Sequence, residues 1–117
     1  MANRNRRISV TEGKALYGNW QSSRQPLISQ SFPQDPSDFT FNLSELQEYL
    51  AYVMDQSKKQ GIEDPGIRVY FGAFDDEQGN KATVFFAPTT GDESEDDNNY
   101  NLDAFDFGTG GWPPRSY

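Results

Sequence analysis

The chain contains no His and no Cys, so any chemistry must come from carboxylates, hydroxyls, amines or aromatic rings. Imidazole and thiol groups are the usual choices for base catalysis, covalent catalysis and transition-metal binding near neutral pH. Ser–His and Cys–His catalytic pairs are therefore excluded. The S-x-x-K, P-loop and G-x-G-x-x-G motifs are missing as well. We predict a protein that is not an enzyme, with no catalytic residues and no cofactor.

Carboxylates are the remaining candidates, and they gather in two short stretches of the sequence. Oxygen ligands suit Ca²⁺ or Mg²⁺, and a pair of carboxylates can hydrolyse a glycosidic bond. A metal binder or a carboxylate-based hydrolase is therefore an alternative, with candidate residues Asp75, Asp76, Glu77, Asp92, Asp96 and Asp97. The nearest match to a calcium loop begins at Asp97, but Leu102 replaces its Gly and Gly108 replaces its last Glu. We therefore predict no metal site and interpret these stretches as solvated acidic loops.

The formal net charge is −8, and it is unevenly distributed. Residues 1–60 carry seven basic and six acidic side chains, whereas residues 61–117 carry three basic and twelve acidic ones. Nucleic-acid binding needs clustered Lys and Arg to neutralise phosphates, so this distribution argues against that function. An acidic surface of this kind favours a basic protein partner.

Length and composition indicate a single domain over residues 1–117. We divide it into a basic flexible end at 1–9, a folded core at 10–89 and an acidic, aromatic tail at 90–117. No stretch approaches the roughly 20 apolar residues of a membrane span, and residues 1–30 lack the apolar segment of a secretory signal. We expect a cytoplasmic protein with no membrane association.

The clearest periodic pattern follows Asn42, which can cap a helix with Glu45 at the capping-box position. Gly61 can end this helix in a left-handed conformation. The residues that share its apolar face are Leu46, Tyr49, Leu50, Val53 and Met54. The pattern predicts one long amphipathic helix.

Residues 67–74 and 81–87 alternate as two strands around a polar loop. Pairing Phe74 with Lys81 gives a register in which one face is uniformly apolar, and we expect the helix to cover that face. Its members are Ile67, Val69, Phe71, Ala73, Ala82, Val84 and Phe86. The predicted fold is therefore α+β, with the helix packed on a small antiparallel, hairpin-based sheet.

The opposite face of the hairpin is mixed, and it is a candidate binding surface. Two strands and a helix are marginal alone, so the N-terminal segment, a third strand near 39–41, the tail or another chain must cover part of it. We favour the tail, with Arg68 paired to a tail carboxylate. The residues of this face include Arg68, Tyr70, Gly72, Phe74 and Phe85.

The two ends of the chain give weaker signals. Thr11 can cap a short helix to about Gln21, and residues 22–38 read as a loop with a short strand at 27–31. Residues 90–103 have the composition of a disordered segment. Residues 108–111 read as a flexible link. We expect Trp112 and the two prolines after it to pack as an anchor, with a polyproline docking peptide as the alternative.

Three segments resemble a family of small uncharacterised proteins from Bacteroidota-type bacteria. They are L-x-x-Y-L-A-Y-V at 46–53, G-I-R-V-Y-F-G-A at 66–73 and T-V-F-F-A-P-T at 83–89. The endings at 107–108 and 111–114 are similar too. The resemblance implies a helix-plus-hairpin core and a bacterial source, but no known activity. The acidic stretch at 92–97 lies outside the shared pattern.

We therefore predict a non-enzymatic protein–protein interaction module that is inhibitor-like or immunity-like. It would bind a basic partner or associate with itself through the Tyr70/Phe85 face. A small-ligand binder at Arg68, Tyr70 and Gly72 is a further alternative, and it requires an open pocket there. The predicted partner-binding residues are Arg68, Tyr70, Gly72, Phe74, Phe85, Asp92, Glu93, Glu95, Asp96, Asp97 and Trp112.

Overall fold

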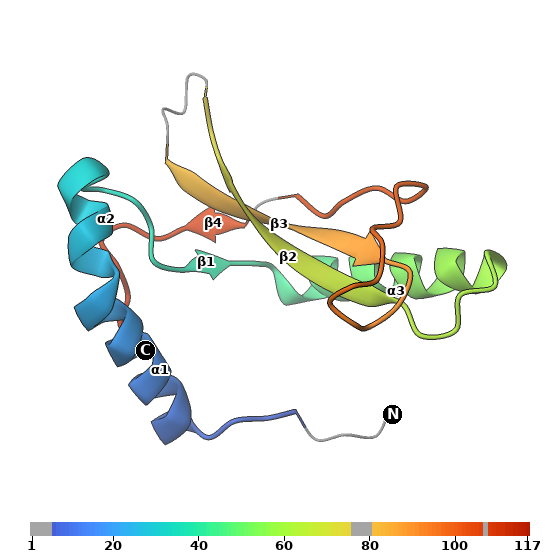
Figure 1. The fold of residues 1–117 in the computed structure, drawn as a ribbon, viewed down its shortest axis with the longest axis horizontal. Helices are drawn as coiled ribbons and strands as arrows, with labels where there is room; N and C mark the ends of the chain where they lie inside the picture. The colour runs from blue at the N-terminus through green and yellow to red at the C-terminus, as the bar shows by residue number, and fades with distance from the viewer. Residues whose placement is uncertain (1–5, 76–80, 107) are drawn as a thin grey trace.

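The computed structural model describes residues 6–75, 81–106 and 108–117. The fold is α+β, as predicted, and contains two separate two-stranded antiparallel sheets, β1–β4 and β2–β3 (Figure 1). In chain order the elements are α1 (Val10–Ser23), α2 (Gln25–Ser31), β1 (Phe39–Thr40), α3 (Leu43–Lys59), β2 (Gly66–Ala73), β3 (Ala82–Thr89) and β4 (Thr109–Gly110).

Helix α3 confirms the strongest local prediction. The side chain of Asn42 accepts a hydrogen bond from the backbone N–H of Glu45 at 2.9 Å, which satisfies one free donor of the first turn. At the other end Gly61 adopts φ 79°, and the N–H of Ile62 donates to the carbonyl of Ser57 at 2.9 Å. This Schellman-type ending needs a residue that tolerates positive φ, which glycine does.

The β2–β3 hairpin has the predicted register, in which Tyr70 lies opposite Phe85. The expectation that α3 covers its whole apolar face is wrong. Val84 is buried, and the Phe86 ring lies 4.9 Å from that of Phe41, but Val69 is 57% exposed and Phe71 is 90% exposed. The covering is concentrated on the β3 side of this face and leaves most of the β2 side exposed.

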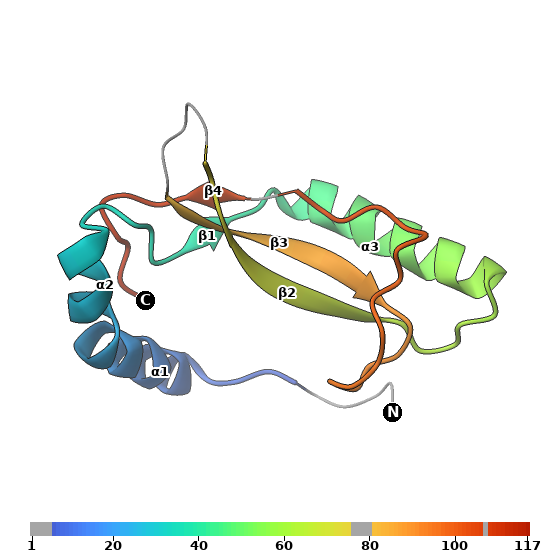
Figure 2. The same ribbon diagram turned by 45° about the horizontal axis from the view of Figure 1, so that its top comes forward.

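The N-terminal region is helical for longer than the sequence suggested. Ser9, and not Thr11, caps α1, and it forms a reciprocal capping box with Glu12. Residues 25–31 form α2, where we expected loop and strand, because Arg24 stays in the right-handed helical region and Pro26 falls in the first turn, where proline is tolerated. In Figures 1 and 2, α1 and α2 lie at one side of the molecule, apart from the β2–β3 sheet and α3.

The end of the chain returns to the N-terminal half. Residues 39–40 do form a strand, but β1 pairs with β4 and not with the hairpin. The expected flexible link at 108–111 is therefore partly a strand. Gly108 permits the close approach, because a Cβ there would lie 2.7 Å from the carbonyl oxygen of Thr40. Beyond β4, the ring of Tyr117 lies against Gly13 of α1.

Aromatic rings fill much of the small core. Phe41 and Tyr49 lie 5.7 and 4.7 Å from Phe105, which in turn lies 5.9 Å from Phe86. Within the described residues, the buried apolar side chains are Val53, Val84 and Leu102. The Cα radius of gyration is 16.3 Å, above the roughly 13 Å of a compact domain this long. In the same part of the chain, no helix combines the length and apolar character needed to cross a membrane.

Candidate functional site

The acidic stretch forms a loop that connects β3 to the tail, and short-range hydrogen bonds define its path. We call residues 91–97 the acidic loop. The N–H of Thr90 donates to the carbonyl of Asp97 at 2.9 Å and closes its base. Within it, the N–H of Glu93 donates to Oδ2 of Asp96 at 2.9 Å, and the N–H of Asp96 donates to the carbonyl of Glu93 at 3.1 Å, which closes a turn over residues 93–96. The expectation of disorder overlooked these bonds, which composition alone does not reveal.

Arg68 of β2 fastens the acidic loop to the sheet. Its guanidinium donates to the carbonyls of Ser94 at 3.0 Å and Asp96 at 2.9 Å, and to Oδ1 of Asn98 at 2.9 Å. The predicted pairing with a tail carboxylate is wrong, because these partners are carbonyl and amide oxygens. Arg68 therefore holds the loop by its backbone, where its planar fork of donors can reach two or more acceptors.

The acidic side chains of the loop remain without ion pairs. Asp92, Glu93, Glu95 and Asp97 are exposed, and Asp96 is half-buried because it accepts the bond within the loop. Elsewhere in the described part of the chain, Lys59 and Asp55 of α3 form an ion pair at 3.5 Å. Since Arg68 contacts the loop's carbonyls, the carboxylates are left facing solvent.

The Tyr70/Phe85 face is partly covered by the chain's own tail. The two rings stack with centroids 5.4 Å apart and planes 17° apart, and Nδ2 of Asn98 donates to the Tyr70 hydroxyl at 2.8 Å. This hydrogen bond, followed by the nearby Arg68, lowers the pKa of Tyr70. Leu102 of the tail is buried. The tail covers part of this face through residues 98–102, and not through Phe105, whose ring packs on Phe86 of the other face. Self-association through the Tyr70/Phe85 face stays a prediction.

The small-ligand hypothesis fits this face less well than expected. A cavity of about 440 Å³ does lie between Tyr70, Phe85 and residues 98–104 of the tail. Arg68, however, is already bound to the loop. At Gly72, a Cβ would lie at an ordinary contact distance of 3.5 Å from Thr83, so that position has no special need for glycine.

The remaining predicted residues lie elsewhere. Phe74 and Trp112 line a separate cavity of about 210 Å³ near the free end of the hairpin, beside Phe39 and Gly110. Trp112 is 47% exposed, so it packs only in part as the expected anchor, and no residue of the acidic loop lines this cavity. The structure does not join these two residues with Arg68 into one site.

The metal-binding alternative gains no support in the residues described. They include no group of three or more Asp or Glu side chains arranged to hold an ion. Asp76 and Glu77, which the hypothesis also used, lie outside the described residues, as does Phe107 of the tail.

Sequence reasoning missed the two asparagines after the loop. Asn99 is buried, its N–H donates to the carbonyl of Pro88 at 2.8 Å, and its Nδ2 donates to Oε1 of Gln60 at 2.8 Å. Asn98 joins Arg68 to Tyr70, as above. The return of apolar residues at Tyr100 and Leu102 was the available signal that the preceding amides are packed.

Two tyrosines of α3 form hydrogen bonds with the backbone of the tail. The Tyr49 hydroxyl donates to the carbonyl of Asp103 at 2.8 Å, and the N–H of Asp103 donates to the Tyr52 hydroxyl at 3.0 Å. Burial, with smaller contributions from Tyr52 and Asp103, raises the pKa of Tyr49 to about 12. The Tyr49 hydroxyl is therefore neutral near pH 7, and the two hydroxyls position the tail by these hydrogen bonds.

Comparison with known proteins leaves the site to be interpreted from its own chemistry. No protein-family model matches the chain, and no curated protein or solved structure matches it significantly.

Proposed function

We propose that this chain is a non-enzymatic protein–protein interaction module that binds a basic partner through the acidic loop. One observation carries the proposal: Arg68 binds the loop through backbone carbonyls and not through its carboxylates, so the exposed carboxylates remain accessible to a partner. Clustered charge of one sign speeds encounter with an oppositely charged protein. An inhibitor-like or immunity-like role against a basic protein fits this chemistry and the bacterial family that the sequence resembles.

The ordering of the loop favours binding as well as encounter. A disordered acidic segment loses conformational freedom when it binds, and this loss lowers affinity. Here, hydrogen bonds from Arg68, Thr90 and Glu93 already define the backbone. The carboxylates are thus presented from a preorganised scaffold. The same proposal places the chain in the cytoplasm, since a sequence without Cys suits a reducing compartment.

The test compares two variants of equal net charge. The loop variant combines Asp92→Asn, Glu93→Gln, Glu95→Gln and Asp97→Asn. The control variant neutralises four exposed acids elsewhere, with Glu48→Gln, Glu63→Gln, Asp64→Asn and Asp106→Asn. Each is titrated with a labelled oligolysine peptide as a model basic ligand, and binding is followed by fluorescence anisotropy.

We expect the loop variant to bind at least about tenfold more weakly than the wild type, and the control variant to stay within about threefold. The wild-type affinity should fall steeply between about 0.05 and 0.5 M NaCl because exposed charges are screened. Equal losses in the two variants would show that bulk charge, and not the loop, attracts the ligand, and the proposal would fail.

A further inference from the structure

The two edges of the β2–β3 sheet differ in how their backbone groups are used. On the outer edge of β3, the N–H of Ala82 donates to Oδ1 of Asp35 at 3.0 Å. Farther along, Phe86 and Phe105 exchange two backbone hydrogen bonds of 3.3 and 2.9 Å, and the carbonyl of Pro88 accepts from Asn99. The chain therefore covers this edge itself.

The outer edge of β2 is open. The N–H of Phe74 donates to the carbonyl of Lys81, so every second residue of β2, counted back from Phe74, forms hydrogen bonds to β3. Residues 67, 69, 71 and 73 lie between them and direct their backbone groups outward. Phe86 confirms this alternation, because it lies opposite Val69 and bonds outward to Phe105. Within the described part of the chain, no hydrogen bond reaches the outward groups of these four residues.

Natural proteins usually protect such an edge with proline, lysine, a bulge or a covering segment. Residues 66–73 contain no Pro and no Lys, and their one charged side chain, Arg68, is bound to the acidic loop. The pairing with β3 is continuous over all eight residues, without a bulge. An unprotected strand of this length is a template for another strand.

Apolar side chains are exposed on α3 as well as on β2. Tyr49, Tyr52 and Gln60 of α3 contact the tail at the β3 side. From the helical spacing, Leu50 and Met54 lie on the side of α3 away from these contacts. They are 38% and 59% exposed, and Val69 and Phe71 of β2 are 57% and 90% exposed.

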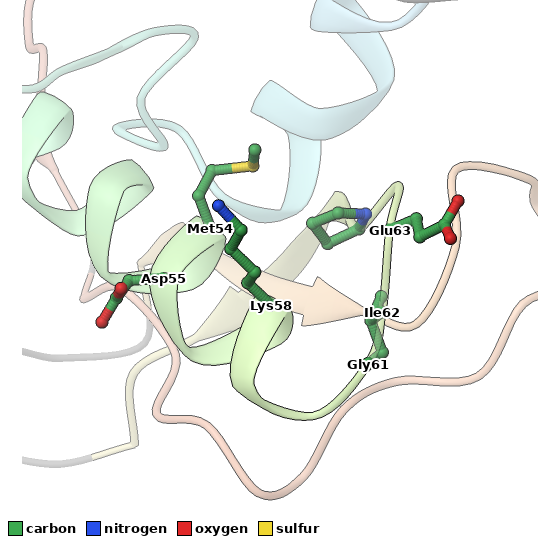
Figure 3. A pocket seen from close by; sticks show the side chains of 7 residues that line it. Met54, Asp55, Lys58, Gly61, Ile62 and Glu63 are labelled. Carbon is green, nitrogen blue, oxygen red and sulfur yellow. The ribbon is translucent and has the colours of Figure 1, made fainter.

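A cavity of about 500 Å³ lies between the last turns of α3 and the turn that leads to β2 (Figure 3). Met54, Ile62 and Pro65 form its apolar lining, with Lys58 and Glu63 at its rim. The rim thus carries both signs of charge, unlike the acidic loop, which Arg68 holds on the other face of the sheet.

We propose that the open edge of β2 binds β2 of a second copy of this chain, in antiparallel orientation about a two-fold axis. The two hairpins would form one four-stranded sheet with both α3 helices on the same face. A copy supplies what the edge lacks: an equally unpaired strand and a matching apolar face, so that Val69 and Phe71 meet their own counterparts.

Sheet geometry supports a second copy as the occupant. With strands about 4.8 Å apart, and each α3 over its own hairpin, the two helix axes would lie about 10–14 Å apart. Helices pack at about 8–10 Å, so at the shorter of these separations the exposed apolar side chains of the two α3 helices would be close to contact. A rim of mixed charge also suits a copy better than a strongly basic peptide.

The interface differs from the acidic loop, so this inference stands or falls separately from the proposed function. An edge of eight residues is about 26 Å long, a small interface, and we expect a dissociation constant in the micromolar range. Sedimentation velocity of the full chain from about 1 to 300 µM should show monomers converting to dimers. Apolar strand pairing should change little between about 0.1 and 0.5 M NaCl, in contrast to binding at the loop.

Two variants test the location of the interface. Val69→Pro removes an outward N–H without removing a bond to β3, and Phe71→Lys places a charge on the exposed apolar face. Each should weaken dimerisation at least about tenfold while the circular dichroism spectrum stays unchanged. The control is Tyr100→Lys, because Tyr100 is 88% exposed, similar to Phe71, but lies in the tail.

We expect the Tyr100 variant to dimerise like the wild type. A wild-type chain that stays monomeric at the highest concentration would overturn the proposal and leave the edge to a strand from another protein. Dimerisation that survives both the Val69 and the Phe71 variants would also overturn it, because the contact would then lie elsewhere.

Discussion

Replacing Arg68 tests whether this one side chain orders the acidic loop. The variant Arg68→Met keeps much of the apolar stem but removes three hydrogen bonds, to Ser94, Asp96 and Asn98. A hydrogen bond to a charged group is worth about 1.5–3 kcal/mol in a favourable site. Arg68 is only half-buried, so solvent screens part of this, and we expect the free energy of unfolding to fall by about 1–2 kcal/mol in total.

Chemical denaturation measures that loss of free energy. In thermal unfolding, the same loss should lower Tm by about 4–10 °C for a chain of this size. Hydrogen exchange adds a local readout, because the N–H groups of Thr90, Glu93 and Asp96 bond within the loop and should exchange faster in the variant. Arg68→Lys keeps the charge without the planar fork and should lose an intermediate amount. Arg115→Met removes an exposed cation elsewhere and serves as the control.

The reasoning fails if Arg68→Met unfolds with the same free energy as the Arg115→Met control and leaves exchange in the loop unchanged. Solvent would then satisfy the loop's carbonyls as well as Arg68 does. The preorganisation assigned to the loop would have no basis.

Three further predictions concern α3 and the tail. Gly61→Ala should lower the free energy of unfolding by about 1–2 kcal/mol in a urea titration, because residue 61 has φ 79°, and an unchanged midpoint would argue against this helix ending. Ser57→Ala should leave stability unchanged or raise it by up to about 1 kcal/mol, since the Ser57 hydroxyl is buried without a partner; a clear loss would reveal a hidden hydrogen bond. The raised pKa of Tyr49, about 12, means that folding favours its neutral form. Its contribution to the free energy of unfolding is therefore complete below pH 10 and is lost as the pH rises toward 12. Ultraviolet titration should show one of the six tyrosines ionising late, and Tyr49→Phe should remove that late step.

Local signals were enough to predict α3 and the β2–β3 hairpin. The cap at Asn42, the left-handed Gly61 and the alternation on both strands each depend on neighbouring residues, and the register followed from matching apolar positions. The failure at residues 25–31 is also local. Pro26 falls in the first turn, where proline is tolerated, and Arg24 stays in the right-handed helical region, so a short helix follows α1 directly.

The candidate site could be predicted only in part, because its bonds join residues distant in sequence. Arg68 and Tyr70 were identified, but their partner Asn98 lies about 30 residues away in a segment whose composition is typical of disorder. Strands β1 and β4 are two residues each and lie about 70 residues apart, which leaves no periodicity to detect. The exposure of Phe71 depends on where α3 lies across the sheet, which apolar patterning does not specify.

The most direct test of the central claim is to map a basic ligand onto the ¹⁵N-labelled chain by NMR. During a titration with oligolysine, we predict amide shift changes concentrated at residues 91–98, which disappear in about 0.5 M NaCl. Changes spread evenly over all acidic surfaces, or centred on the exposed carboxylates of α3, would contradict the claim that the ordered acidic loop is the binding site.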